Sequence, residues 1–217
     1  MANTVKDMKA VFAEMAERLN KQYPKKEEPA QTISAQVVQT VAGQMAKRGY
    51  EMSQKAIEIV TDYLKGYNLW LCGSVGVGKT YFFDIMSKVR VEEKGLPPIV
   101  KLSMIETMGW TMDQAREWVM DNKGDDVLLD DVGSEPLMNS YGVKAELFPY
   151  LLEKRMQVTT KRTHITSNLG AKDIIERYDV RVSDRFAQMF KYERFADRKS
   201  MRKTRPWKAP RQGAGML

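Results

Sequence analysis

A glycine-rich segment in the first half of the chain has the residue types and the spacing to hold phosphates. Residues 73–80 read GSVGVGKT and meet the pattern G-x-x-x-x-G-K-T. Glycines let the backbone curl so that successive N–H groups point at phosphate oxygens, and a following helix adds the partial positive charge of its N-terminus. The lysine of such a loop reaches the β- and γ-phosphates, and the threonine hydroxyl holds Mg²⁺. We therefore predict that ATP and Mg²⁺ bind here, through Gly73, Ser74, Val75, Gly76, Val77, Gly78, Lys79, Thr80 and Tyr81.

Two adjacent carboxylates follow about 50 residues after the lysine. Residues 127–135 read VLLDDVGSE, in which three apolar residues predict a buried strand. Ligand sites of open α/β sheets lie beyond the carboxyl ends of the strands. We expect Asp130 to bind Mg²⁺ directly or through water, and Asp131 to orient and polarise the attacking water. Glu135 is the next candidate for the role of Asp131.

Small polar residues end a later strand. Residues 163–168 read THITSN, and Asn168 is placed to reach the γ-phosphate or the attacking water. Alone, this segment indicates only a turn, but after the two preceding segments it makes Asn168 a candidate catalytic residue beside Lys79 and Asp131. His164 alternates with Ile165 on the same strand, which favours a structural role for the histidine over a catalytic one.

Apolar runs that predict strands alternate with helical patterns through the region that must position these side chains. Strands are predicted at 69–72, 99–102, 127–131 and 163–166. Helices are predicted at 81–93, 104–122, 143–156 and 172–190. The second helix is interrupted near Gly109, and Pro149 should kink the third because it removes a backbone donor. The alternation predicts an α/β fold with a doubly wound, parallel, five-stranded sheet flanked by helices, of which the pattern locates four strands.

The whole chain is predicted to consist of five segments. The predicted segments are a partner-binding helix at 1–24, a linker at 25–33, a helical region at 34–66, an ATPase domain at 67–202 and a basic, disordered tail at 203–217. The helical region is expected to break near Arg48 and Gly49. For the first helix, packing onto its own domain is the alternative to binding a partner.

Composition narrows the functional classes. The chain has 217 residues and a net charge of +7. No apolar run approaches the roughly 20 residues that span a bilayer, which predicts a cytoplasmic protein with no membrane partner. One cysteine and one histidine exclude a disulfide framework and a metal cluster built from these residues. Basic residues concentrate at 181–211, which indicates either a polyanionic partner or a solvated basic face.

Five segments occur in an order that resembles the AAA+ ATPases. They are GSVGVGKT, VLLDDVGSE, THITSNL, ERYDVRVSDRF and SMR. Within that group the chain is most similar to the DnaC-type helicase loaders and their IstB-type relatives in transposition. The fragment TSNLGAKDIIERYDVRVSDRF is the most specific part of the resemblance, which covers about Ile59 to Lys203.

The resemblance implies roles for two arginines. Arg185 is expected to act on the ATP of a neighbouring subunit, with Arg181 as the alternative. Arg202 is expected to contact the nucleotide of its own subunit, with Arg198 as the alternative. The segment after Phe190 is short, so the C-terminal helical lid of AAA+ proteins is expected to be minimal or absent.

The resemblance also implies a function. It predicts an ATPase that loads a replicative DnaB-type helicase, binds single-stranded DNA and forms an ATP-dependent homo-oligomer. One alternative is a transposition helper that uses the same ATPase to remodel duplex DNA. Another is a nucleotide-dependent binding module with little turnover, in which Asp131 stands in place of a glutamate.

Overall fold

The structure, a computed structural model, describes most of the chain between residues 33 and 195. The described residues are 33–135, 138–140, 143–170, 172–174, 176–178, 182 and 189–195. The predicted N-terminal helix, all but the last residue of the predicted linker and the predicted tail lie outside them. Among the described helices, none is long and apolar enough to cross a membrane.

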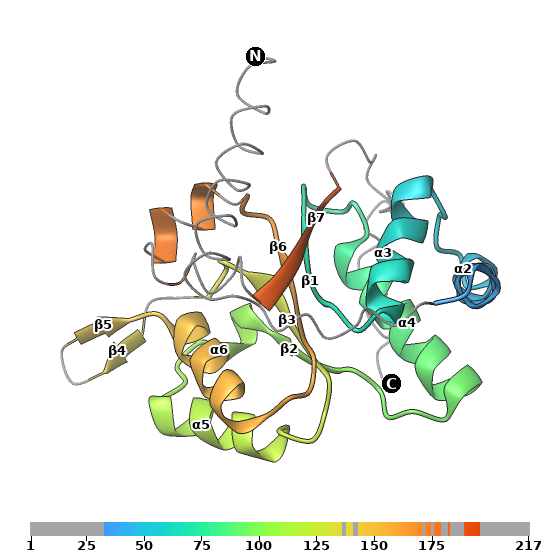
Figure 1. Ribbon diagram of the computed structural model, residues 1–217. Helices are drawn as coiled ribbons and strands as arrows, with labels where there is room; N and C mark the ends of the chain where they lie inside the picture. The colour runs from blue at the N-terminus through green and yellow to red at the C-terminus, as the bar shows by residue number, and fades with distance from the viewer. Residues whose placement is uncertain are drawn as a thin grey trace, which may run out of the picture.

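A parallel sheet of five strands lies at the centre of the described chain (Figure 1). Its strands are β1 (Asn68–Cys72), β2 (Val100–Ser103), β3 (Val127–Val132), β6 (Thr163–Ser167) and β7 (Phe190–Arg194). Their order is β2-β3-β6-β1-β7, and every neighbouring pair is parallel. This confirms the predicted α/β class and the five-stranded parallel sheet. All carboxyl ends therefore lie along one edge.

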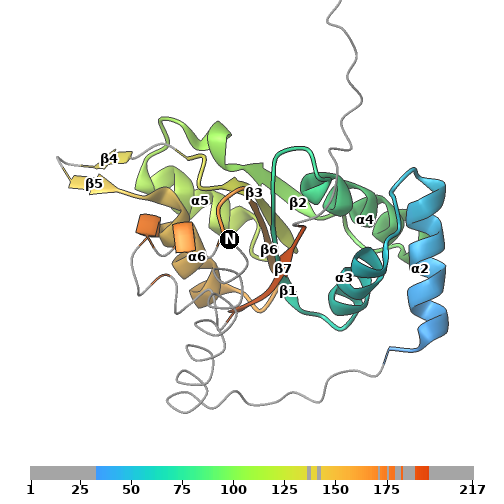
Figure 2. The ribbon, with the colours of Figure 1, turned by 90° about the horizontal axis from the view of Figure 1, so that it is seen from above.

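Helices cover both faces of the sheet (Figures 1 and 2). One face carries α2 (Ala35–Lys47), α3 (Gln54–Leu64) and α4 (Lys79–Lys94), and the other carries α5 (Met112–Asp121) and α6 (Leu147–Val158). In β1, Leu69 and Leu71 pack in the first core, whereas Trp70 and Cys72 pack in the second, because consecutive strand side chains point to opposite faces. A strand buried on both faces reads as a continuous apolar run, which explains why the sequence predicted β1.

Polar caps set the starts of the helices that precede the sheet. The Ser34 hydroxyl accepts a hydrogen bond of 3.3 Å from the backbone N–H of Val37, and the Ser53 hydroxyl accepts one of 3.2 Å from that of Ala56. Because α2 ends before Arg48 and α3 begins after Ser53, the predicted break in this region is confirmed. The predicted interruption near Gly109 is also confirmed, since a short 3₁₀ helix (Met104–Thr107) precedes α5.

The predicted helix at 143–156 is wrong at its start. Val143–Ala145 forms β5, which pairs antiparallel with β4 (Met138–Ser140) in a separate two-stranded sheet. The helix α6 begins only at Leu147. Pro149 is therefore its third residue, where a backbone N–H has no intrahelical acceptor, and proline fits without the expected loss of a hydrogen bond.

The fifth strand, β7, is the one that the sequence pattern did not locate. The predicted helix at 172–190 is correct for the described residues from 172 to 189, but Phe190 already pairs with β1. β7 carries three charged residues in five, and the ion pairs of Lys191 with Asp62 and of Glu193 with Lys55 attach it to α3. These partners lie far away in the sequence, so the segment resembled the end of a polar helix.

Candidate functional site

The loop between β1 and α4 carries the glycine-rich segment. β1 ends at Cys72, and α4 begins at Lys79 with Gly78 at its N-cap position. Gly73 starts the loop with a φ of 155°, and a Cβ there would lie 3.1 Å from both the Cβ and the carbonyl oxygen of Phe195. Only glycine fits this approach without displacing Phe195, which directly follows β7. The pattern thus lies between a strand and the N-terminus of a helix, the arrangement that favours anions.

The ammonium group of Lys79 lies over the loop that precedes it. The side chain is buried, and its Nζ donates hydrogen bonds to the carbonyl oxygens of Gly73 (2.8 Å) and Ser74 (3.0 Å). It also donates one of 2.8 Å to Oδ1 of Asn168, which follows β6. The structure therefore brings together two residues that the sequence placed in separate segments.

The Asp130 carboxylate lies at the carboxyl end of β3 beside the start of α4. Its Oδ1 accepts hydrogen bonds from the hydroxyl groups of Thr80 (2.8 Å) and Thr166 (2.5 Å). Burial raises the pKa of Asp130, while the two hydroxyl donors oppose this rise. Thr80 and Asp130, the two predicted Mg²⁺ ligands, are thus direct neighbours.

Asp131 has a backbone conformation that is rare for a residue with a side chain. Its φ is 58°, and the register of β3 against β6 shifts between Leu129 and Val132, so that β3 bulges here. The Asp131 N–H donates to the Thr166 hydroxyl at 2.9 Å. The half-buried Asp131 carboxylate makes no hydrogen bond or ion pair with any described residue. Strained positions of this kind are concentrated at functional sites.

Thr166 is the residue of this cluster that the sequence interpretation missed. Its fully buried hydroxyl accepts from the Asp131 N–H and donates to the Asp130 carboxylate. Thr166 and Asn168 are two residues apart in THITSN, and residues two apart share one face of a strand. That spacing was the available signal.

Glu135, the alternative to Asp131, has its carboxylate engaged elsewhere. This buried side chain accepts hydrogen bonds from the Tyr178 hydroxyl and from the Gly133 N–H (2.8 Å). Arg177 donates to the backbone carbonyl of Glu135 at 2.8 Å. These contacts attach the turn after β3 to the helical residues 176–178, and they engage the Glu135 carboxylate within the protein.

The other predicted site residues have mixed surroundings. Val77 is buried in the core beneath the loop, whereas Val75 is 59% exposed. The Tyr81 hydroxyl donates to the carbonyl oxygen of Arg48 at 2.8 Å, which ties the start of α4 to the end of α2. The predicted arginines Arg181, Arg185, Arg198 and Arg202 lie outside the described residues.

The residues present fit a Mg²⁺-bound nucleoside triphosphate. Loop N–H groups and Lys79 are donors for phosphate oxygens, and Thr80 and Asp130 supply oxygen ligands of the kind that Mg²⁺ prefers. Within the described residues, no group of three or more His, Cys, Asp or Glu side chains could hold a metal.

The strand, loop and helix together define an α/β protein of the P-loop class. Among solved structures, the chain is similar to the DnaC helicase loader, with a TM-score of 0.49 and 18% identity, over 74% of this chain and 99% of that one.

It is also similar to a protein from Streptococcus pyogenes serotype M3 proposed to be a primosome component (TM-score 0.45, 18% identity, 76% of this chain and 81% of that one). A third similar structure is AMPPCP-bound DnaA from Aquifex aeolicus (TM-score 0.38, 16% identity, 67% of this chain and 49% of that one). No protein-family model and no curated protein matches the sequence.

Proposed function

We propose that this protein is a Mg²⁺-dependent ATPase that loads a replicative DNA helicase. The convergence of Lys79, Thr80, Asp130 and Asn168 at the carboxyl edge of the sheet is the observation that carries the ATPase assignment. In this proposal the ATPase domain spans residues 67–202, after a helical region at 34–66. The sequence resemblance to DnaC-type loaders supports the choice of partner.

The residues of the loop bind and orient the phosphates. The backbone N–H groups of 74–78 and the N-terminus of α4 favour the negative charge, and Lys79 supplies a mobile cation for the β- and γ-oxygens. When bound, ATP supplies the phosphoryl group, and Mg²⁺ supplies positive charge that offsets the negative charge of the phosphates. Thr80 and Asp130 hold the metal, and the Asn168 amide lies next to Lys79, where it reaches the γ-phosphate or the attacking water.

Asp131 orients and polarises the attacking water in this proposal. Asp131 lies in the bulge of β3, directly after Asp130. The Thr166 hydroxyl accepts a hydrogen bond from the Asp131 N–H and donates one to the Asp130 carboxylate, so it holds the Asp131 backbone in place relative to Asp130. Because no described residue neutralises the Asp131 carboxylate, it is free to accept a hydrogen bond from water. Arg185 is proposed to reach the ATP of a neighbouring subunit, and Arg202 the ATP of its own.

The partner assignment is tested by co-purification. Residues 1–24 are proposed to bind a DnaB-type helicase in the cytoplasm, with 25–33 as the tether, and ATP is proposed to assemble subunits around single-stranded DNA. A tagged full-length protein should retain the helicase, whereas a protein lacking residues 1–24 should lose the helicase and keep its ATPase activity. If the shortened protein still co-purifies with the helicase, this helix is not the adaptor. If a transposase co-purifies instead, the transposition role is correct.

One observation favours a second candidate function, a nucleotide-dependent binding module with little turnover. Asp131 is one methylene shorter than glutamate, and its strained backbone gives it little freedom to adjust. Phosphate release, measured with and without single-stranded DNA and the helicase, separates the two functions. The loader ATPase should show turnover that one of these partners stimulates, whereas the module should bind ATP tightly and release no phosphate under any of these conditions.

A further inference from the structure

The turn after β3 (residues 131–135) has a backbone that its surroundings must hold in place. The Asp131 carbonyl oxygen accepts hydrogen bonds from the N–H (3.0 Å) and the hydroxyl group (2.6 Å) of Ser134. Both Asp131 (φ 58°) and Gly133 (φ 98°) have positive φ angles. This conformation is unfavourable for a residue with a side chain, such as Asp131, and persists only where other contacts fix it. The direction of the Asp131 side chain therefore depends on the contacts of this turn.

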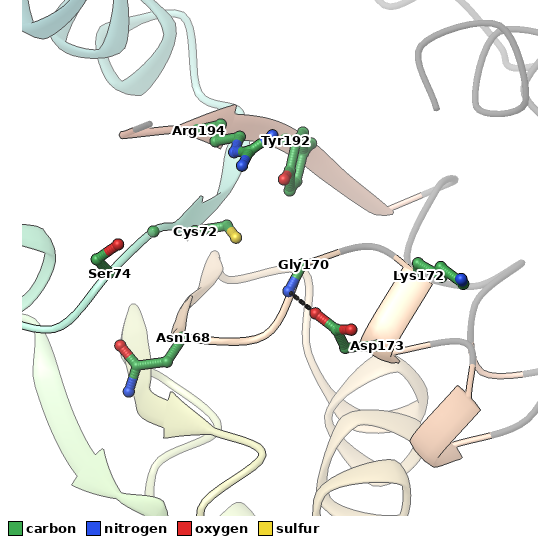
Figure 3. A pocket seen from close by; sticks show the side chains of 9 residues that line it. Cys72, Ser74, Asn168, Gly170, Lys172, Asp173, Tyr192 and Arg194 are labelled. Carbon is green, nitrogen blue, oxygen red and sulfur yellow. Dashed lines mark hydrogen bonds between the residues drawn. The ribbon is translucent and has the colours of Figure 1, made fainter. Parts of the chain in front are cut away.

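Leu169, two residues after β6, covers one side of the turn. A Cβ on Gly133 would lie 2.4 Å from Cδ1 of Leu169, so the backbone of the turn is in direct contact with this side chain. The chain then enters the helical residues 172–174, where the Asp173 carboxylate accepts a hydrogen bond of 2.8 Å from the Gly170 N–H (Figure 3). The turn thus packs on the end of β6, directly before this helical segment.

The buried carboxylate of Glu135 connects the turn to the helical residues 176–178. Its Oε2 accepts a hydrogen bond of 2.8 Å from the Gly133 N–H, and its Oε1 accepts one from the Tyr178 hydroxyl. The Tyr178 ring is buried in turn and lies 5.4 Å from the ring of Phe148 in α6. One carboxylate therefore joins the backbone of the turn to a side chain that is fixed in the second core.

We propose that Glu135 is a positioning residue, which orients Asp131 toward the attacking water through the turn between them. The proposal rests on the proposed ATPase function, in which Asp131 polarises this water. Gly133 is only two residues after Asp131, so a fixed Gly133 N–H limits rotation of the backbone that carries the Asp131 carboxylate. Both oxygens of Glu135 already accept hydrogen bonds from the protein, and Tyr178 holds the one that Gly133 does not. Glu135 thus acts as an anchor for the turn, and the base is Asp131.

The test measures hydrolysis and nucleotide affinity separately in the full-length protein. Glu135→Ala should lower single-turnover phosphate release by about 10²-fold, the cost of misplacing a catalytic group by about 1 Å. Its affinity for an ATP analogue whose β–γ bridge cannot be hydrolysed should match that of the parent in calorimetry, because Glu135 bonds Gly133 and Tyr178 and not the phosphate loop. Tyr178→Phe keeps the ring but removes one donor, and should lower phosphate release by about 10-fold. Unchanged release in both variants would overturn the proposal.

Glu135→Gln separates an anchoring role from a role as the base. The amide oxygen can still accept the Gly133 N–H, and the amide nitrogen can donate to the Tyr178 oxygen, so the turn stays attached. An amide cannot take a proton from water. Glu135→Gln should therefore keep most of the parent turnover, and a loss as deep as that of Glu135→Ala would show that Glu135 itself is the base.

The matched control is Glu146→Gln, the same change at a second carboxylate near Arg177. The Glu146 carboxylate lies 3.7 Å from Nε of Arg177 but forms no hydrogen bond with residues 131–135, all of which the structure describes. This variant should hydrolyse ATP at the parent rate. If it loses as much turnover as Glu135→Ala, the effect belongs to the charges around Arg177 and not to the turn.

Asp131→Asn shows whether Glu135 acts through Asp131. The double variant with Glu135→Ala should be no slower than Asp131→Asn alone, whereas a further loss of about 10²-fold would mean that the two residues act independently.

Asp131→Asn also separates this inference from the function on which it rests. If the parent releases no phosphate, or if Asp131→Asn hydrolyses ATP at the parent rate, the proposed role of Asp131 fails and that of Glu135 fails with it. If Asp131→Asn loses turnover while Glu135→Ala keeps it, only the assignment of Glu135 fails. Thermal unfolding shows which variants retain the fold, and Tyr178→Phe and Glu135→Gln decide the question if Glu135→Ala does not fold.

Discussion

Charged side chains lie at both ends of the parallel strands, at the amino ends (the amino edge) and at the carboxyl ends (the carboxyl edge). The two groups differ in whether their charges are paired within the protein. At the amino edge, Asp126 precedes β3 and is bound by Arg90 of α4 and by Arg162, which precedes β6. Arg162 also lies over the Tyr63 ring, 4.3 Å from its centroid. Nearby, the buried Arg155 donates to Thr163 and to two backbone carbonyl oxygens. Every charge in this network has a partner.

At the carboxyl edge of the same strands, two charged side chains have no partner in the part of the chain that the structure describes. Within the described residues, neither the Asp131 carboxylate nor the Arg194 guanidinium has a hydrogen bond or an ion pair. The pKa values show the same contrast. Burial would raise the pKa of Asp126, but hydrogen bonds from Arg162 and Arg90 outweigh it and hold the pKa well below its usual range. Burial raises the pKa of Asp130, four residues later. The charges at the amino ends are therefore paired within the protein, whereas Asp131 and Arg194 at the carboxyl ends have no partner among the described residues.

The largest effect is expected for Asp131→Asn. The amide keeps the size of the side chain but cannot polarise water as a carboxylate does, so turnover should fall by about 10²- to 10⁴-fold. ATP affinity and the unfolding temperature should stay close to those of the parent, because the Asp131 carboxylate has no described partner. Phosphate release and calorimetry measure the two quantities. An unchanged rate of hydrolysis would show that Asp131 is not the water-polarising residue.

Asp126→Ala should have the opposite profile. It leaves Arg90 and Arg162 without their shared carboxylate, and removing one partner of a buried ion pair costs about 3–5 kcal/mol of stability. Urea unfolding measures this loss. At temperatures where the variant is folded, its nucleotide affinity should match that of the parent. A loss of nucleotide binding without a loss of stability would contradict the division between the two edges.

A buried histidine near the amino edge of the sheet should make the stability of the protein depend on pH. His164 is the only histidine of the chain and is fully buried, with its Nδ1 accepting the Leu69 N–H and its ring beside Tyr63 and Phe83. Burial, together with the charge of Arg162, lowers its pKa to about 3, although Asp126 opposes the change.

In the unfolded chain the pKa of a histidine is about 6.5, so the unfolded state binds the extra proton between this pH and about 3. Stability should therefore fall as the pH drops below 6.5, by about 1.4 kcal/mol per unit. Urea unfolding at pH 7.0, 5.5 and 4.5 measures the slope. His164→Gln, which cannot titrate, should remove most of it, and an equal slope in that variant would assign the effect to other groups.

The smallest effect is expected for Thr166→Val, a change at the carboxyl edge that should weaken the apparent affinity for Mg²⁺. The variant keeps the shape of the side chain but removes the donor to Asp130 and the acceptor for the Asp131 N–H. Hydrogen-bond partners of metal ligands contribute about 10-fold or more to metal affinity. The Mg²⁺ concentration that gives half-maximal activity should therefore rise by about 10-fold. Thr166→Ser keeps the hydroxyl and should behave like the parent, and a matching defect in that variant would indicate a packing role instead.

The sequence alone predicted the parts of the site that are contiguous along the chain. The predicted phosphate-binding residues from Gly73 to Thr80 are consecutive, so a glycine-rich loop and the helix after it can be recognised from a short stretch of sequence without knowledge of distant contacts. Asp130 and Asn168 were predictable because each follows an apolar run, and parallel strands bring their carboxyl ends to one edge. The fold class followed from the same alternation of strands and helices.

Only the tertiary structure decided which distant groups meet. β7 was missed because its charged side chains are stabilised by Asp62 and Lys55 of α3, contacts that leave no local pattern. Arg194 lies beside the phosphate loop because β7 pairs with β1. Thr166 of β6 forms hydrogen bonds with both Asp130 and Asp131 of β3. Asp126 forms ion pairs with Arg90 and Arg162, which come from two other segments. A periodic pattern records which face of an element is buried, whereas the partner that satisfies a particular charge is set by how the elements pack.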